Sequence, residues 1–320
     1  SQRTMAWDKW GWAALGAATG GLVVYVIKVK KYNFSRLPFR SFYGAPKGEI
    51  KSLLEKPSAN VTLLSADFCP FAARAWLALL EKGIPFEHIQ CSYFMGEKDP
   101  GTKVLYGLGL RTVPAMIHNG QIFTESTELA NYIDDAFPGT PLKPADASMR
   151  FNMNLFLTRH NSLPGCFYTF LKNQDQEKHA ELAAKTEGVL KTVNDDLSIF
   201  DGPFLCGDQL TLADIQLFGF IERLMVVAPA WKKGWCIPTE FTNIPKWFSA
   251  MKARDSAKIA SADRSELSLK AHCFEAKTRD EYLIEVYQCY AENEVDLAKE
   301  KQRESGKVGF NAYKKFKGVQ

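Results

Sequence analysis

One cysteine of this chain stands where thiol chemistry is favoured. Cys69 directly precedes Pro70 in the run SADFCPFAAR, between an apolar run at 61–66 and a run of helical periodicity at 71–83. These runs predict a strand and a helix, with Pro70 at the first helical position, where its missing N–H has no structural cost. Free N–H groups and the helix dipole at that end would lower the thiol pKa. Cys69 is therefore a candidate nucleophile, and the alternative is a small residue that only caps the helix.

The second position of a dithiol site is absent from this motif, because Ala72 stands where a C-x-x-C pair would carry its other cysteine. A single thiol can act only through a mixed disulfide that a second, external thiol resolves. The seven cysteines are scattered, and neither they nor the isolated histidines match a zinc spacing. We therefore expect reduced thiols and no metal.

Short elements after the first helix must position whatever Cys69 acts on. An alternating run predicts a second strand, two runs around Asn119-Gly120 predict a β-hairpin, and an amphipathic run predicts a helix. These runs are, in order, 86–92, 114–118, 121–125 and 125–137. The predicted order is β-α-β, an irregular stretch, a β-hairpin and a final helix.

These motifs, in this order, resemble the thioredoxin-like N-terminal domain of cytosolic glutathione transferases. The resemblance is carried by Cys69-Pro70-Phe71 with Arg74, Val113-Pro114-Ala115, Glu125-Ser126, Tyr132-Ile133 and Phe137-Pro138. A cysteine in place of the tyrosine or serine of other classes is similar to the omega class and to dehydroascorbate reductases. The resemblance covers about residues 61 to 258 and implies an α/β thioredoxin-like domain followed by an all-α domain.

The resemblance implies glutathione as co-substrate, with the mixed disulfide formed on Cys69. The implied glutathione contacts are Phe71, Val113, Pro114, Glu125 and Ser126, with Lys98 or Lys103 as a further contact. The segment that holds the two lysines departs from the family pattern, and solvated surface lysines are the alternative there. Glu125-Ser126 could equally be a simple helix cap. The bond before Pro114 is expected to be cis, and Arg74 is expected to be structural.

The rest of the globular body is predicted to be helical. A Pro- and Gly-rich linker at 139–145 separates a thioredoxin-like domain at 59–138 from a helical domain at 146–260. Thr211 and Asp214 have the spacing of a capping-box variant, and we expect them, like Pro70, to be structural. Apolar residues recur at helical spacing within 149–160, 179–200, 210–227 and 243–257. A C-terminal extension, 261–320, contains one long predicted helix.

The N-terminal segment, 1–31, contains eighteen residues without formal charge at about 10–27. Trp7, Trp10 and Trp12 cluster at one end of this run, Tyr25 and Tyr32 lie at the other, and basic residues follow, a pattern that predicts a single transmembrane helix. Gly16 and Gly20 form a GxxxG motif that would let another membrane helix approach closely. A buried core helix of this length is the alternative.

The net charge of +4 is unevenly distributed. The basic linker at 32–58 and the last residues, 299–320, are rich in Lys and Arg, whereas 52–298 carries a net charge of −8. An acidic body disfavours nucleic acid as a partner. The basic arms suit anionic lipid or other membrane-protein subunits, and the positive-inside rule places the body on the cytosolic or matrix side.

Two functions are compatible with these patterns. The intact motifs around Cys69, Val113 and Ser126 favour a membrane-anchored, omega-like, glutathione-dependent thiol transferase or reductase. The alternative is a non-catalytic accessory subunit of a respiratory-type complex that uses the same fold as a scaffold. The weakly hydrophobic span favours the mitochondrial inner membrane with the body in the matrix, and the endoplasmic reticulum with a cytosolic body is the alternative.

Overall fold

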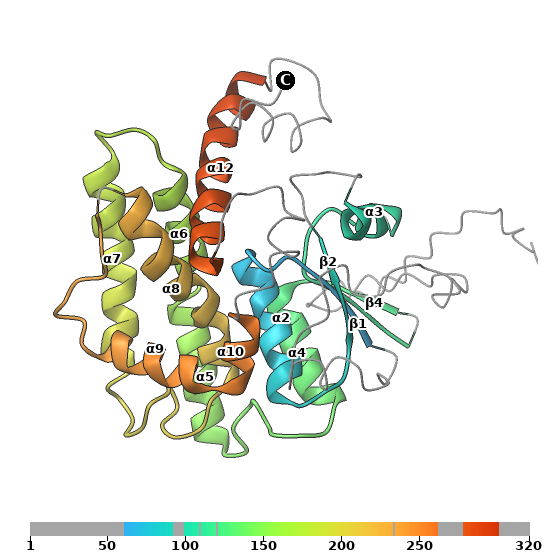
Figure 1. The fold of residues 1–320 in the computed structure, drawn as a ribbon. Coiled ribbons are helices and arrows are strands. Elements are labelled where there is room, and N and C mark those ends of the chain that lie inside the picture. Colours follow the sequence, from blue (N-terminus) through green and yellow to red (C-terminus); the bar gives the residue numbers. More distant parts are fainter. Residues whose placement is uncertain are drawn as a thin grey trace, which may run out of the picture.

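The computed structural model describes residues 61–91, 99–108, 110–119, 121–232, 234–261 and 278–300. The predicted membrane segment, the basic linker and Lys98 lie outside these ranges. Figure 1 shows a small α/β domain beside a larger helical domain, with helix α12 running along the latter. Among the helices of the described ranges, none combines the length and the apolar character needed to cross a membrane.

A four-stranded mixed sheet organises the first domain in the order β2-β1-β3-β4. The strands are β1 (Val61–Ser65), β2 (Glu87–Gln90), β3 (Ala115–His118) and β4 (Gln121–Phe123). β2 runs parallel to β1, whereas β3 is antiparallel to both β1 and β4. Because Ala115 pairs with Leu64, the start of β3 lies beside the end of β1. The residues before β3 and after β1 therefore meet at one edge of the sheet.

Three helices complete this domain: α2 (Pro70–Glu81), α3 (Pro100–Gly107) and α4 (Ser126–Ala136). The prediction of an irregular stretch between the second and third strands was wrong, because α3 lies there. Asp99 caps α3 by accepting from the Thr102 N–H at 2.7 Å, and Pro100 opens its first turn. This helix has only eight residues, and two of them are glycines, so its hydrophobic periodicity is too weak to predict it.

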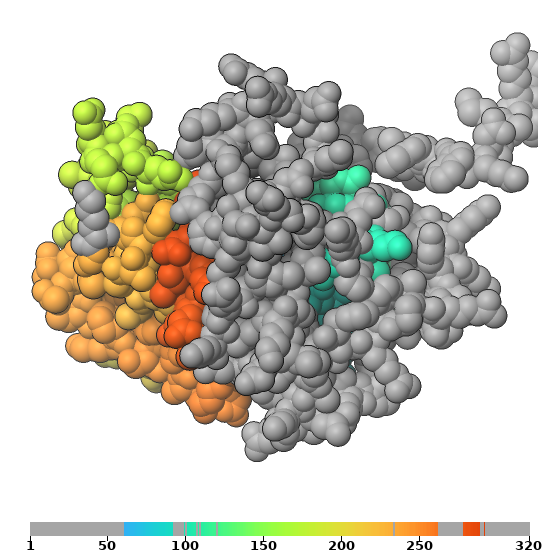
Figure 2. All heavy atoms as spheres, turned by 45° about the horizontal axis from the view of Figure 1, so that its top comes forward, coloured from blue at the N-terminus to red at the C-terminus, as the bar shows by residue number. Residues whose placement is uncertain are grey.

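The second domain consists of helices that surround the buried helix α8. Its members are α5 (Ala147–Arg159), α6 (Leu163–Lys172), α7 (His179–Asp196), α8 (Leu212–Trp231), α9 (Asn243–Ala253) and α10 (Asp255–Ala260), with α12 (Arg279–Glu300) packed against α6 and α8. In Figure 2 the red spheres of α12 lie directly against the orange spheres of the helical domain.

A capping box begins α8. Asp214 Oδ2 accepts from the Thr211 N–H at 2.9 Å and from its hydroxyl at 3.0 Å. The other oxygen accepts from the Leu205 N–H at 3.0 Å and from Trp247 Nε1 at 2.9 Å. Because Asp214 is fully buried, these four hydrogen bonds offset the loss of water around its carboxyl group. Thr211 and Asp214 thus tie α8 to α9 and to the loop before α8.

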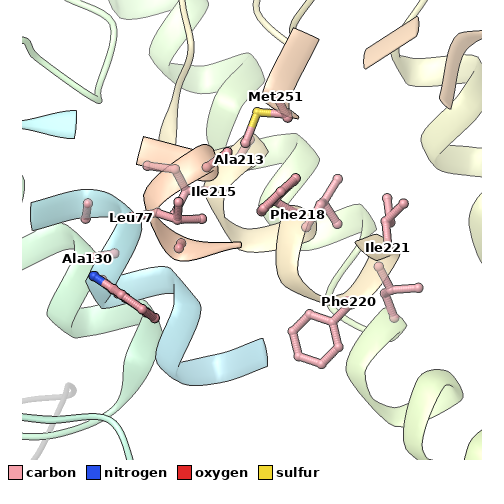
Figure 3. Packing of buried hydrophobic residues seen from close by; sticks show 14 of the residues in the cluster. Leu77, Ala130, Ala213, Ile215, Phe218, Phe220, Ile221 and Met251 are labelled. Atoms are coloured by element: carbon pink, nitrogen blue, oxygen red, sulfur yellow. The ribbon is translucent and has the colours of Figure 1, made fainter. Parts of the chain in front are cut away.

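A single apolar cluster joins the two domains, since buried residues of α2 and α4 pack against α8. Figure 3 shows Leu77 of the first domain next to Ile215 of α8. Burial of apolar surface stabilises such an interface by roughly 25 cal/mol for each Å² that is removed from water. Helix α2 is therefore packed between the sheet and the helical domain.

Candidate active site at the start of helix α2

Cys69 is the N-cap residue of α2, with extended backbone angles of φ −78° and ψ 118°. Its N–H donates to the Ala66 carbonyl at 2.9 Å, and its own carbonyl accepts from the Ala73 N–H at 3.1 Å. Pro70 occupies the first turn, and the Cys69 thiol side chain is only partly exposed. The thiol therefore lies where β1 ends and where the N–H groups of α2 are still unpaired within the helix.

The electrostatic surroundings of Cys69 contain two opposing effects. Burial raises the pKa of the thiol above its ordinary value of 9.0, and this effect is the largest. The Ala72 and Phe71 N–H groups and the charges of Arg223 and Arg74 act in the opposite direction without cancelling it. The predicted lowering of the pKa was therefore wrong in its net sign, because removal of water outweighs the helix terminus. The thiol at rest is neutral, and donors surround it for the moment when negative charge develops on sulfur.

Arg74, whose charge acts on this thiol, is a buried cation. Its Nε donates to the Gln216 carbonyl at 3.2 Å and its Nη1 to Ser126 Oγ at 3.1 Å. The Phe71 and Phe220 rings each lie 5.1 Å from the guanidinium carbon. Burial lowers the pKa of Arg74 to about 10, so it stays protonated at neutral pH. Within the described part of the chain, no carboxylate lies within ion-pair distance of Arg74, which is unusual for a buried charge.

A cavity of about 370 Å³ opens beside Arg74, between the two domains. Aromatic and aliphatic side chains form most of its wall, and its polar members are Arg74, Thr127, His160, Asn161 and Gln216. Thr127 donates to Gln216 Oε1 at 3.3 Å, whereas the buried Nε2 of Gln216 has no hydrogen-bond partner among the described residues. A cation and an unpartnered amide donor in one cavity wall favour an anionic ligand.

Ser126 and Glu125 stand at the start of α4, next to this cavity. Ser126 is buried and accepts from Arg74, as described above. Glu125 has a positive φ of 68°, a conformation that is rarely adopted without a reason, and its side chain does not cap α4. Glu125 is thus the N-cap residue of α4 by its backbone, while its side chain takes no part in the cap.

The remaining predicted contacts are distributed unevenly around Cys69. Val113 and Pro114, joined by a cis bond as the resemblance implied, immediately precede β3 and share the sheet edge at which β1 ends. Phe71 lines the cavity. Lys103 is exposed on α3, and none of the contacts described above links it to the thiol. Within the described residues, no three His, Cys, Asp or Glu side chains gather as a metal site.

Several residues near the thiol were missed by the sequence reading. Gln216 and Thr127 line the cavity, and Arg223 donates to the carbonyl oxygens of the two residues before Cys69. One signal could have identified Arg223: the pair Glu222-Arg223 interrupts an otherwise apolar run in α8. A helix that is apolar on all sides is buried, so charges within it must have partners.

Two family models match the chain. "Glutathione S-transferase, N-terminal domain" matches residues 63–141, and "Glutathione S-transferase, C-terminal domain" matches residues 148–255. Together these ranges contain the thiol, the cavity and the capping box of α8. Helix α12 begins after both of them.

Curated proteins and solved structures extend this match. Protein IN2-1 homolog A of Oryza sativa subsp. japonica is 35% identical over 161 residues, which span 50% of this chain but only 63% of the rice protein. Glutathione S-transferase omega-1 of Mus musculus is 26% identical over 245 residues, 75% of this chain and 88% of the mouse protein. The crystal structure of glutathione transferase Omega 3C from Trametes versicolor has a TM-score of 0.57 at 25% identity, covering 68% of this chain and 95% of the fungal chain.

Proposed function

The chain belongs to the glutathione S-transferase family, and from this premise we propose that it is an omega-like, glutathione-dependent thiol transferase. Members of this family use glutathione as co-substrate. The observation that carries the proposal is the placement of the Cys69 sulfur at the start of α2, where the Ala72 and Phe71 N–H groups and the charges of Arg223 and Arg74 act against the effect of burial. These groups stabilise the negative charge that develops on the sulfur when it attacks and when it leaves.

The proposed reaction has two thiol–disulfide exchanges. Cys69 loses its proton as its sulfur attacks the glutathione sulfur of a glutathionylated thiol, and the leaving substrate sulfur takes up a proton. A glutathione thiolate then attacks the glutathione sulfur of the Cys69 mixed disulfide, which releases glutathione disulfide and Cys69. The proton lost by this glutathione restores the neutral Cys69 thiol. Ala72 offers no resolving thiol, so the second glutathione is required.

The raised pKa of Cys69 fits this sequence of steps. Burial keeps the thiol neutral at rest, which protects it from unrelated oxidants. The Phe71 and Ala72 N–H groups stabilise charge that develops on sulfur during attack and again when Cys69 leaves. Preorganised donors in a water-poor site exert a larger effect than the same donors would in water.

We assign the γ-glutamyl carboxylate of glutathione to the cavity beside Arg74. Arg74 and Ser126 would bind the carboxylate, and Gln216 Nε2 would gain the partner that it lacks. This placement supplies the negative charge that a buried guanidinium requires. The cysteinyl part would then extend past Phe71 to Cys69, with Val113 and Pro114 at the neighbouring sheet edge. Contacts from Glu125 and from Lys98 or Lys103 remain predictions.

The test is glutathione-dependent reduction of hydroxyethyl disulfide by the wild type and by Cys69→Ser. We expect Cys69→Ser to reduce kcat/KM by at least about a hundredfold, because the variant lacks the covalent step. Cys236→Ser is the matched control, since Cys236 is exposed and lies outside the site. Unchanged activity of Cys69→Ser would refute the proposed mechanism.

Membrane anchoring through residues 10–27 forms a second part of the proposal. This part is supported by the uncharged run and by the aromatic and basic residues that flank it. The accessory-subunit alternative rests on the basic arms, which also lie outside the described residues. We expect the full chain to resist extraction from mitochondrial inner membranes by alkaline carbonate, with protease access to the body only from the matrix side. Complete release of the chain by carbonate would contradict the anchor.

A further inference from the structure

Helix α12 lies beyond the residues matched by the two family domains, yet its side chains reach the loop that leads to Cys69. The Tyr287 hydroxyl donates to the Phe68 carbonyl at 3.0 Å, and the Tyr282 hydroxyl donates to Asp67 Oδ1 at 2.9 Å. Both tyrosines are buried. In Figure 1 the lower end of α12 lies close to the start of α2. A segment 215 and 219 residues away in sequence thus holds the two residues that precede the thiol.

Arg223 of α8 holds the same loop through its guanidinium group. Its Nε donates to the Phe68 carbonyl at 3.2 Å, and its Nη2 donates to the Asp67 carbonyl at 2.9 Å. The side chain of Arg223 is almost completely buried. A buried cation that donates to neutral carbonyls needs a carboxylate nearby, because it has lost the solvation of water.

Glu222 supplies that carboxylate, and its other cationic neighbours are Arg279 of α12 and, at 3.6 Å from Oε1, Lys252 Nζ of α9. Glu222 Oε2 lies 2.7 Å from Arg223 Nη1, while Arg279 forms a two-point pair with both Glu222 oxygens at 3.0 Å. The Ser261 hydroxyl donates to Glu222 Oε1 at 2.7 Å. Burial alone would raise the pKa of Glu222, but the charges of Arg279 and Arg223 and the hydrogen bonds hold it at about 2. The carboxylate is therefore ionised at any physiological pH.

We propose that Arg279 is a positioning residue for Cys69 and acts through the Glu222–Arg223 pair. With Arg279 in place, both oxygens of Glu222 are occupied, and Arg223 keeps Nε and Nη2 on the loop carbonyls. Without Arg279, the buried carboxylate keeps the Ser261 hydroxyl and the more distant Lys252 ammonium on Oε1 but lacks its two-point partner, and it competes for the N–H groups of the adjacent Arg223. Turning these groups toward Glu222 removes both hydrogen bonds to Asp67 and Phe68. Helix α12 is thereby an integral part of the thiol site.

The expected effect of Arg279 on catalysis rests on the proposed thiol-transferase function. Its expected effect on the loop before Cys69 does not. The loop before Cys69 can be followed without glutathione, because the Cys69 N–H is hydrogen-bonded to the Ala66 carbonyl at 2.9 Å. Amide hydrogen exchange of a peptide spanning 66–78 reports directly on opening of this loop and of the first turns of α2.

Arg254 offers a matched control. It makes the same kind of two-point pair, with both oxygens of Glu81 at 2.6 Å, and the Ser256 hydroxyl again joins the pair. Glu81 is the last residue of α2, so this pair lies at the opposite end of the helix from Cys69. Arg254→Gln therefore breaks a similar ion pair without touching the loop at 66–68.

We expect Arg279→Gln to accelerate exchange in peptide 66–78 by at least about tenfold, and Arg254→Gln to leave this peptide unchanged. Unchanged exchange in Arg279→Gln, or equal acceleration in both variants, would overturn the inference. If Arg279→Gln does not fold, Arg279→Lys, which keeps the charge but loses the two-point contact, takes its place with the same comparisons.

Activity provides the second readout. We expect Arg279→Gln to lower kcat for hydroxyethyl disulfide by about tenfold while the KM for glutathione changes less than about twofold, because Arg74 and Ser126 are untouched. A raised KM with an unchanged kcat would contradict the assigned role. A wild type without transferase activity would refute the proposed function, and the exchange measurements would still decide whether Arg279 positions the loop.

Discussion

Replacement of Arg74 by methionine separates a ligand-binding role from a structural one. Methionine preserves the apolar packing against Phe71 and Phe220 and removes the hydrogen bonds to Ser126, Thr127 and the Gln216 carbonyl. Each lost charge-assisted bond weakens the fold by about 1.5–3 kcal/mol. Removing a buried guanidinium also relieves a desolvation penalty of several kcal/mol. Because these terms oppose each other, we expect the free energy of unfolding to change by less than about 2 kcal/mol.

In glutathione binding, no relieved desolvation offsets the lost contact of Arg74→Met. The variant loses a charge-assisted contact to the γ-glutamyl carboxylate, worth about 1.5–3 kcal/mol, which corresponds to a Kd about 10- to 150-fold weaker. The pKa of Arg74, at about 10, leaves the wild-type side chain charged at neutral pH, so the full effect is expected there.

Two measurements decide the outcome: isothermal titration calorimetry with glutathione and urea unfolding of the free protein. Cysteinylglycine, which lacks the γ-glutamyl group, should bind the wild type and Arg74→Met equally well. Arg150→Met, at an exposed position of α5, is the control for a general effect of losing an arginine. A large loss of stability with an unchanged glutathione Kd would refute the reasoning and would make Arg74 a structural residue.

Two further predictions concern the start of α2. A Cβ at Gly219 of α8 would lie 2.9 Å from the Pro70 carbonyl oxygen, so Gly219→Ala should destabilise the fold in urea by about 1–3 kcal/mol and slow Cys69 chemistry. The control is Gly188→Ala in α7, where nothing lies within 4 Å of the added Cβ, and it should stabilise the fold by up to about 1 kcal/mol. A loss of stability in both variants would contradict this account. Because burial raises the pKa of Cys69, its alkylation by iodoacetamide, followed by mass spectrometry, should still increase with pH at 9.0; a plateau below about pH 8 would contradict the burial argument.

Local sequence patterns were sufficient for most of the secondary structure around the site. The strand before Cys69, the helix after Pro70 and the hairpin after Val113 all depend on alternation, periodicity and turn residues that neighbours in the sequence supply. Helix α3 was missed because its apolar residues are few and its glycines are poor helix formers. It forms because Asp99 caps it and because β2 packs against Gly101 closely enough to exclude a side chain.

By itself, the sequence determined which residues could do chemistry: a cysteine at a helix start, a proline before a strand, and a serine at the next helix start. Tertiary structure alone decided how they would behave. Arg74 became a buried cation facing a cavity only when α8 covered it, and Arg279 reached the Glu222–Arg223 pair only when α12 folded back onto α8. The Cys69 pKa shows the physical reason most clearly. The helix terminus that lowers it is a local feature, readable from the sequence, whereas the desolvation that raises it comes from segments far apart in the chain, which only the folded structure brings together.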